Sequence, residues 1–239
     1  MSDEVLRLNK LSKSFGAIRA LSDVDFTLYA GEISALVGDN AAGKSTLLKI
    51  VAGIYRKDEG EMFLGGEEVE FKSPMDARRA KIEMVFQDFM LCPDLDVASN
   101  MFLGKEFTTF QVLKRREMEK MVKSRLEEVK FDIPFLKRKV KFLSGGQQQM
   151  VGILRALLFE PKILLLDEPT ASLSASASMQ VMEFLRKLRE KISMIYVTHD
   201  LPSVIKYSDR IIVLRAGKVV AERKPSETDP IELVKLMRL

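Results

Sequence analysis

The chain has 239 residues, of which 46% are hydrophobic and 30% charged, a composition typical of a globular protein with a buried core. Its apolar stretches are too short for a transmembrane helix, and the opening MSDEVLRLNK lacks the apolar core of a secretory signal, so we expect an intracellular protein. A single cysteine, Cys92, and a single histidine, His199, exclude an internal disulfide and a zinc site built from several such residues.

The first third of the chain alternates between strand and turn patterns. Alternation of apolar and polar residues predicts strands at Val5–Leu8 and Val24–Leu28. An apolar strand, Ile33–Val37, leads into a loop, and apolar residues at helical spacing predict a helix over Lys44–Ala52. Two further β elements are expected, a hairpin over Glu61–Glu70 and a strand over Ile82–Phe86.

The middle of the chain changes character. From residue 88 it is rich in lysine, glutamate and methionine, with a helical pattern over Gln111–Lys130 that Pro134 ends. We therefore expect an inserted, mainly helical subdomain at residues 88–155. Residues 1–87 and 156–239 would form the core and an N-terminal antiparallel β subdomain.

After this insertion, helices and strands alternate. Helices are predicted at about 146–159 and 175–191, and strands at 163–166 and 192–197. A strand pair around Ala216-Gly217 and a short helix at 230–239 complete the pattern. Such alternation is typical of an α/β fold whose largely parallel sheet is covered on both faces.

The loop after the third strand, GDNAAGKST, carries the sharpest chemical pattern. Gly38, Gly43, Lys44 and Ser45 satisfy the spacing of a phosphate-binding loop between a strand and a helix. Backbone N–H groups of such a loop surround the β-phosphate, the lysine reaches the β- and γ-phosphates, and the hydroxyl binds Mg²⁺. We therefore predict an ATP site at these nine residues: Gly38, Asp39, Asn40, Ala41, Ala42, Gly43, Lys44, Ser45 and Thr46.

Two carboxylates follow the apolar strand 163–166. In an open α/β sheet they lie at the carboxyl edge, where ligands collect. Asp167 is suited to hold Mg²⁺, and Glu168 to activate the attacking water as a general base. The segment LLLDE is a weak signal alone, and it gains weight from the phosphate-binding loop about 120 residues earlier.

A third motif, LSGGQ, precedes the helix at 146–159. Glycines at a helix start allow backbone N–H groups to approach an anion closely. Placed between such a loop and such an acidic strand, the motif Ser144, Gly145, Gly146, Gln147 resembles the signature of ATP-binding subunits of ABC transporters. The resemblance extends over essentially the whole chain and implies a P-loop NTPase fold with a RecA-like, mainly parallel core.

The resemblance assigns further roles in chain order. Phe15 matches the aromatic residue that stacks on adenine, although a core aromatic is the alternative. Gln87 matches the glutamine that senses Mg²⁺ and the γ-phosphate, and His199 the switch histidine at the γ-phosphate. Residues 171–174, ASLS, match the loop that crosses between subunits.

The family implies a head-to-tail homodimer in which each ATP lies between one copy's loop and the other's signature. Stretches such as FKSPMDARRAKIEMVFQD resemble ATPases of bacterial simple-sugar importers. The implied partners are transmembrane permease subunits at the cytoplasmic face of the membrane and, indirectly, a substrate-binding protein. The interspersed charges, net +4, predict no nucleic-acid partner.

Three alternatives remain open at the level of sequence. The same engine serves export and regulatory ABC ATPases. A soluble ABC ATPase is a second alternative, but the long coiled coils of DNA-repair relatives and the charged linker of ribosome-acting ones are absent. A degenerate, non-hydrolysing module is the third, because Ala41 stands where the family usually has glycine. Ser174 likewise replaces a common aspartate.

Overall fold

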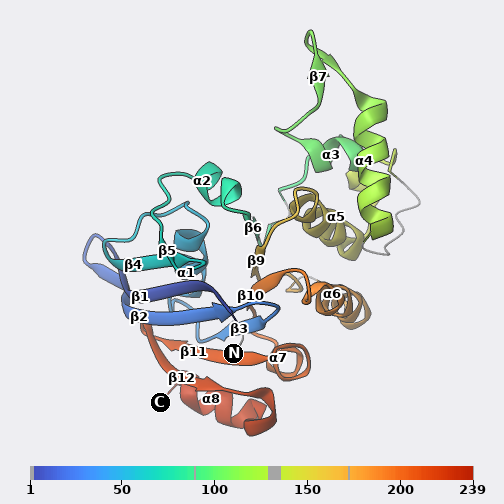
Figure 1. Ribbon diagram of the computed structural model, residues 1–239. Helices are drawn as coiled ribbons and strands as arrows, with labels where there is room; N and C mark the ends of the chain where they lie inside the picture. Colours follow the sequence, from blue (N-terminus) through green and yellow to red (C-terminus); the bar gives the residue numbers. More distant parts are fainter. Residues whose placement is uncertain (1–2, 89, 129–135, 172, 239) are drawn as a thin grey trace.

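Figure 1 shows the computed structural model, which describes residues 3–88, 90–128, 136–171 and 173–238. Residues Pro134 and Ser172, singled out by the sequence, lie outside this part. The N-terminal region forms an antiparallel sheet in the order β2-β1-β4-β5. Its strands are β1 (Glu4–Phe15), β2 (Ile18–Tyr29), β4 (Glu59–Leu64) and β5 (Glu67–Glu68).

A second sheet of six strands has the order β12-β11-β3-β10-β9-β6 and is parallel except for β12. Every residue of its three central strands is buried, because apolar runs such as ILLL face protein on both sides. The expected α/β core and N-terminal antiparallel sheet are thereby confirmed. The strands are β3 (Ile33–Val37), β6 (Ile82–Val85), β9 (Ile163–Asp167), β10 (Ser193–Val197), β11 (Arg210–Arg215) and β12 (Lys218–Arg223).

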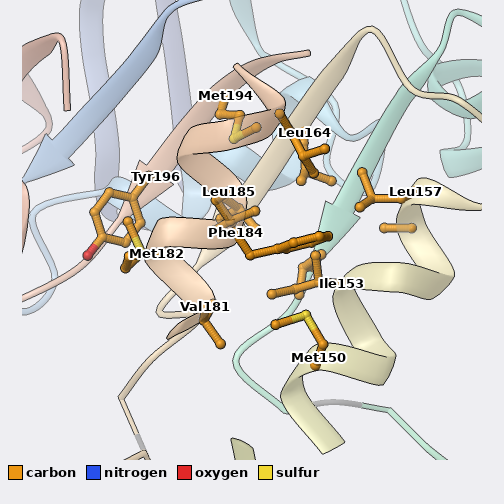
Figure 2. Packing of buried hydrophobic residues seen from close by; sticks show 14 of the residues in the cluster. Met150, Ile153, Leu157, Leu164, Val181, Met182, Phe184, Leu185, Met194 and Tyr196 are labelled. Carbon is orange, nitrogen blue, oxygen red and sulfur yellow. The ribbon is translucent and has the colours of Figure 1, made fainter. Parts of the chain in front are cut away.

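Helices cover the parallel sheet on one face, and the antiparallel sheet and α1 (Lys44–Val51) lie on the other. Alternate residues of β9 enter different cores: Leu164 and Leu166 pack with the helices, and Leu165 with the antiparallel sheet. Figure 2 shows apolar side chains of α5 and α6 meeting Leu164 and Met194. The helices on this face are α5 (Gly145–Leu157), α6 (Ala175–Leu188), α7 (Leu201–Tyr207) and α8 (Pro230–Arg238).

The middle of the chain projects away from both sheets in Figure 1. It holds α3 (Val97–Phe102), a hairpin of β7 (Thr108–Thr109) and β8 (Val112–Leu113), α4 (Arg115–Glu128) and a 3₁₀ turn, Val140–Phe142. Helix α5 runs across the expected subdomain boundary at residue 155. Among the described helices, none combines the length and apolar character that a membrane span requires.

One expected helix start was wrong, and three short helices were not predicted. The helix expected from Gln111 begins at Arg115, because Phe110 and Gln111 have φ values of 46° and 65° and form the tight turn of the β7–β8 hairpin. The short helices α2 (Pro74–Arg79), α3 and α7 were not predicted. Helices of six or seven residues contain too few turns for a helical period to stand out.

A buried ion pair joins the two sheets. Arg210 of β11 donates from Nε to Glu32 Oε1 at 2.5 Å and from Nη1 to Glu222 at 2.9 Å, and its Nη2 bonds the Thr27 carbonyl of β2. The side chains of Arg210 and Glu32 are only 13% and 8% exposed. Because a buried charge needs compensation, this contact fixes the antiparallel sheet against the parallel one.

We predict that Arg210→Met lowers the free energy of unfolding by about 3 kcal/mol or more, since it leaves the Glu32 carboxylate buried without its partner. Chemical denaturation monitored by circular dichroism measures the change. Arg189→Met is the matched control: Arg189 pairs with Asp209 at 2.5 Å, but the two side chains are 41% and 35% exposed, so the loss should stay below about 1 kcal/mol. Equal losses in both variants would contradict the buried role of Arg210.

Candidate functional site

The phosphate-binding loop connects β3 to the start of α1. The Lys44 ammonium is buried and donates to the carbonyl oxygens of Gly38 at 2.8 Å and Asp39 at 2.9 Å. Burial lowers its pKa, against the attraction of Glu168, Asp167 and Asp39. Helix α1 starts without a side-chain cap and has no acidic residue in its first turn. Its first N–H groups therefore lack a side-chain partner, which suits an anion.

Two glycines of the loop are required by close approach. A Cβ on Gly38 would lie 2.1 Å from the Leu214 carbonyl oxygen of β11. Gly43 has a φ of 102°, and a Cβ there would lie 2.5 Å from the Ala20 carbonyl oxygen of β2. Backbone atoms of both sheets thus approach the loop closely, and only glycine fits at these two positions.

Ala41 is the strained residue of the loop. Its φ is 62°, the left-handed region, where a Cβ costs roughly 1–2 kcal/mol. Ala42, in contrast, has no positive φ; it is buried, and its N–H donates to the Asp39 carbonyl at 3.1 Å. Ala41 is therefore held in the conformation that a glycine would adopt without strain, and the loop keeps its closed turn.

The acidic edge of the sheet lies beside this loop. The Ser45 hydroxyl donates to Asp167 Oδ1 at 3.0 Å, although 122 residues separate them. Burial raises the pKa of Asp167, opposed first by the hydrogen bond from Ser45. The hydroxyl of the phosphate-binding loop and the carboxylate at the end of β9 are therefore held next to each other.

Glu168 leaves the strand in a left-handed conformation, with a φ of 51°, and its N–H donates to the Val197 carbonyl of β10 at 3.0 Å. Its Oε1 lies 2.9 Å from His199 Nε2. Burial raises the pKa of Glu168, against the attraction of His199 and Lys44. The proposed base and the proposed switch histidine are thus in direct contact.

Phe15 lies at the end of β1 and outside both cores. Its ring is 42% exposed and meets the edge of the Tyr55 ring at 5.1 Å between centroids. Tyr55 in turn lies below the Lys49 ammonium of α1, at 5.6 Å. The alternative of a core aromatic is therefore wrong, and Tyr55 is a neighbour that no sequence motif indicated.

The LSGGQ segment is shaped by a capping box. Ser144 Oγ accepts from the Gln147 N–H at 3.3 Å, and Gln147 Oε1 accepts from the Ser144 N–H at 2.9 Å. A Cβ on Gly146 would lie 2.9 Å from Ala177 of α6, so this glycine permits close helix packing. Among the described residues, no hydrogen bond joins the segment to Gly38–Thr46 of the same chain.

The remaining motifs meet at one edge. In the sheet, β3, β10, β9 and β6 are adjacent and parallel. Their carboxyl ends lead respectively into the phosphate-binding loop, His199, Glu168 and the exposed Gln87. This is the edge where α/β sheets bind ligands. The sequence pattern of the family described as "ABC transporter" matches residues 21–171. The chain belongs to the ABC transporter family.

Named relatives in this family are ATP-binding subunits of sugar importers. The xylose/arabinose import ATP-binding protein XylG of Sulfolobus acidocaldarius is 41% identical over 99% of this chain and 94% of its own length. The ribose import ATP-binding protein RbsA of Caldanaerobacter subterraneus is 40% identical over 98% of this chain. The chain spans 48% of that relative's length, and 94% of the fructose import ATP-binding protein FrcA of Rhizobium meliloti, which is 38% identical.

Solved ABC cassettes share the fold. A nucleotide-free ATP-binding cassette from an ABC transporter superimposes with a TM-score of 0.86 at 26% identity, covering 98% of each chain. A cassette solved as a dimer in a post-hydrolysis state with ADP and phosphate gives 0.77 at 32% identity, over 92% of this chain and 98% of the other. The predicted ABC ATPase fold and ATPase class are confirmed.

Replacing each of the two neighbouring alanines of the phosphate-binding loop by glycine should change the stability of the protein in opposite directions. We predict that Ala41→Gly stabilises the protein by up to about 1 kcal/mol. The relief of backbone strain favours the folded state, and the greater freedom of glycine in the unfolded chain offsets part of this gain. Ala42→Gly, the matched control, should destabilise it by about 1 kcal/mol, because no strain is relieved and a buried methyl group is lost.

Thermal unfolding of both variants and ATP affinity by calorimetry provide the measurements. The parent should bind ATP, with Ala41→Gly changing the affinity by less than about tenfold, the equivalent of 1.4 kcal/mol. A parent that does not bind ATP, beside an Ala41→Gly form that does, would identify Ala41 as a disabling substitution.

Stability should depend on pH through Asp167. A raised pKa means that the folded state holds the proton more tightly, so stability is lost as pH rises through the unfolded and then the folded pKa. Asp167→Asn should therefore stabilise the nucleotide-free, chelator-treated protein at pH 7, and the gain should vanish below about pH 4.

Asp76→Asn is the control of opposite sign. The pKa of Asp76 is lowered, first by the hydrogen bond from Ser73. This carboxylate adds stability above its unfolded pKa, and the stability is lost as pH falls, so Asp76→Asn should destabilise the protein at pH 7. Denaturant midpoints of the three proteins between pH 4 and 8 test both signs; a destabilised Asp167→Asn form at pH 7 would contradict the burial argument.

Proposed function

We propose that this ABC ATPase is the motor subunit of an importer for a simple sugar. The observation that carries the proposal is the Ser45–Asp167 and Glu168–His199 pairing at one sheet edge. It joins the phosphate-binding loop to a buried carboxylate and the base to the switch histidine. The relatives named as xylose/arabinose, ribose and fructose import proteins support the choice of import and of sugar.

The nucleotide would occupy the loop, with its adenine on the exposed Phe15 ring. Lys44 now donates to two loop carbonyls, and the same ammonium would turn to the β- and γ-phosphates. The N–H groups at the start of α1 would surround the β-phosphate. Because Lys44 is buried, its attraction to phosphate would be weakly screened by water.

A magnesium ion fits the oxygen groups on this edge. Ser45 supplies a hydroxyl and Asp167 a carboxylate 3.0 Å apart, the hard oxygen donors that Mg²⁺ prefers, and Gln87 is exposed after β6. When bound, the ion would supply positive charge that stabilises the phosphate groups. We assign Ser45, Asp167 and Gln87 to hold it.

Glu168 would accept the proton of the attacking water. Its pKa is raised by burial, which strengthens it as a base, and the attraction of His199 and Lys44 opposes this rise. The contact between His199 Nε2 and Glu168 Oε1 orients both groups, and His199 would contact the γ-phosphate.

Hydrolysis would require two copies. Within one chain Ser144 and Gln147 are joined by the capping box and Gly146 packs against α6, so the exposed side of this segment is free to face the loop of a second copy. A solved dimeric cassette with ADP and phosphate supports this arrangement. Residues 88–155 would form the subdomain that contacts permease subunits at the cytoplasmic face of the membrane, with a substrate-binding protein acting indirectly.

We predict that Glu168→Gln lowers ATP turnover by at least about 100-fold, because the general base is lost, while ATP binding is kept. The variant should accumulate as an ATP-bound dimer, measured by light scattering after size exclusion. Glu183→Gln, at an exposed glutamate of α6, is the control and should behave as the parent. Unchanged turnover in Glu168→Gln would remove Glu168 from this role.

The direction of transport is tested with the same pair of proteins. Reconstituted with its permease in vesicles, the parent should drive ATP-dependent uptake of a pentose or hexose delivered by the binding protein, and Glu168→Gln should not. Turnover per molecule should also rise with protein concentration. Outward transport would favour the export alternative, and an absence of turnover the degenerate one.

A further inference from the structure

A buried tyrosine lies behind the catalytic edge. The Tyr196 side chain, on β10, is fully buried on the face of the sheet that α6 covers (Figure 2). Its hydroxyl forms a hydrogen bond of 3.1 Å with the Ser203 hydroxyl of α7. A purely apolar core would be served as well by phenylalanine, so the buried hydroxyl calls for an explanation of its own.

The hydrogen bonds continue from Ser203 to the residues on either side of His199. The Ser203 N–H donates to Asp200 Oδ1 at 3.3 Å, and the Asp200 N–H donates to Thr198 Oγ1 at 3.1 Å. Ser203 and Thr198 are themselves buried, 8% and 3% exposed. The backbone on both sides of His199 is thus held by a chain of hydrogen bonds that ends at the Tyr196 hydroxyl.

The segment of Glu168 lies beside Tyr196, because β9 and β10 are paired in the sheet. Burial raises the pKa of Tyr196, opposed first by the hydrogen bond with Ser203. Thr170 is 8% exposed and lies two residues after Glu168, and the Glu168 N–H is bonded to Val197, the residue after Tyr196. Tyr196 therefore lies beside both segments whose side chains form the Glu168–His199 contact.

We propose that Tyr196 is a positioning residue for hydrolysis: through Ser203, Asp200 and Thr198 its hydroxyl fixes the backbone of His199 and so the placement of His199 against Glu168. The inference rests on the proposed function and adds a residue that is fully buried behind the site. Among the described residues, no side-chain hydrogen bond joins Tyr196, Ser203 or Thr198 to the Gly38–Thr46 loop, so the network acts on the rate of the chemical step and not on ATP affinity.

The test compares Tyr196→Phe, which keeps the ring and removes the hydroxyl, with Tyr207→Phe, a buried tyrosine of α7 outside the network. Tyr196→Phe should lower kcat by about tenfold or more with KM for ATP within about twofold. Tyr207→Phe should match the parent. Ser203→Ala should resemble Tyr196→Phe, and the double variant should be no worse than the more severe single one, because both break one network.

A second readout does not depend on turnover. His199 is the sole histidine of the chain, so a ¹³C-labelled imidazole gives a single assigned NMR signal. Its chemical shift at fixed pH in the nucleotide-free protein should move in Tyr196→Phe and stay in place in Tyr207→Phe.

Distinct outcomes overturn the inference and the proposed function. An unmoved His199 signal in Tyr196→Phe, additive effects of Tyr196→Phe and Ser203→Ala, or a parallel rise in KM would each contradict the positioning role. A parent without ATP turnover would contradict the proposed function alone, because the His199 signal still decides whether Tyr196 places that residue.

Discussion

The structure depends on the burial of a few short parallel strands that end at one edge. Each of β3, β9 and β10 is buried along its whole length, with helices on one face and the antiparallel sheet on the other. The register of these strands cannot shift by one residue without moving the apolar side chains of one face out of their core. The residues that follow these strands, Gly38, Glu168 and His199, are therefore held at fixed relative positions.

Charge is concentrated where this packing ends. Lys44, Asp167 and Glu168 are largely removed from water. Burial lowers the pKa of Lys44 and raises the pKa of Asp167 and of Glu168, which in each case favours the neutral form. Such an arrangement is costly for folding unless the groups find partners. Lys44 bonds loop carbonyls, Asp167 bonds Ser45, and Glu168 meets His199. A nucleotide with its metal ion would offer these groups stronger partners. Nucleotide binding would therefore also offset the electrostatic cost of burying these charges in the folded protein.

Strain at the site is confined to a few positions, and its placement bears on whether the loop is degenerate. Ala41 and Glu168 both adopt positive φ, the first within the loop and the second at the end of β9. Around Ala41 the required glycines, the lysine and the serine remain in place, and Ser45 still reaches Asp167. Strain of this kind commonly accompanies functional sites. An altered but working loop accounts for these contacts better than a decayed one.

Local patterns in the sequence determined the elements and the motifs. Ile33–Val37 is a strand as predicted, and the spacing of Gly38, Gly43 and Lys44 predicted a phosphate-binding loop before any fold was known. These features depend on neighbours in the chain, since a strand or helix period is read within a few residues. The β7–β8 hairpin was not predicted, because its turn has Phe110 and Gln111 in place of the usual glycine or asparagine.

Only the tertiary structure decided which residues meet across long separations. Arg210 pairs with Glu32 178 residues away, and Ser45 with Asp167 122 residues away. The edge contact between the Tyr55 and Phe15 rings and the hydrogen bond between Tyr196 and Ser203 correspond to no pattern in the sequence. The physical reason is that such contacts depend on how buried strands order themselves in a sheet, which the packing of the whole core sets.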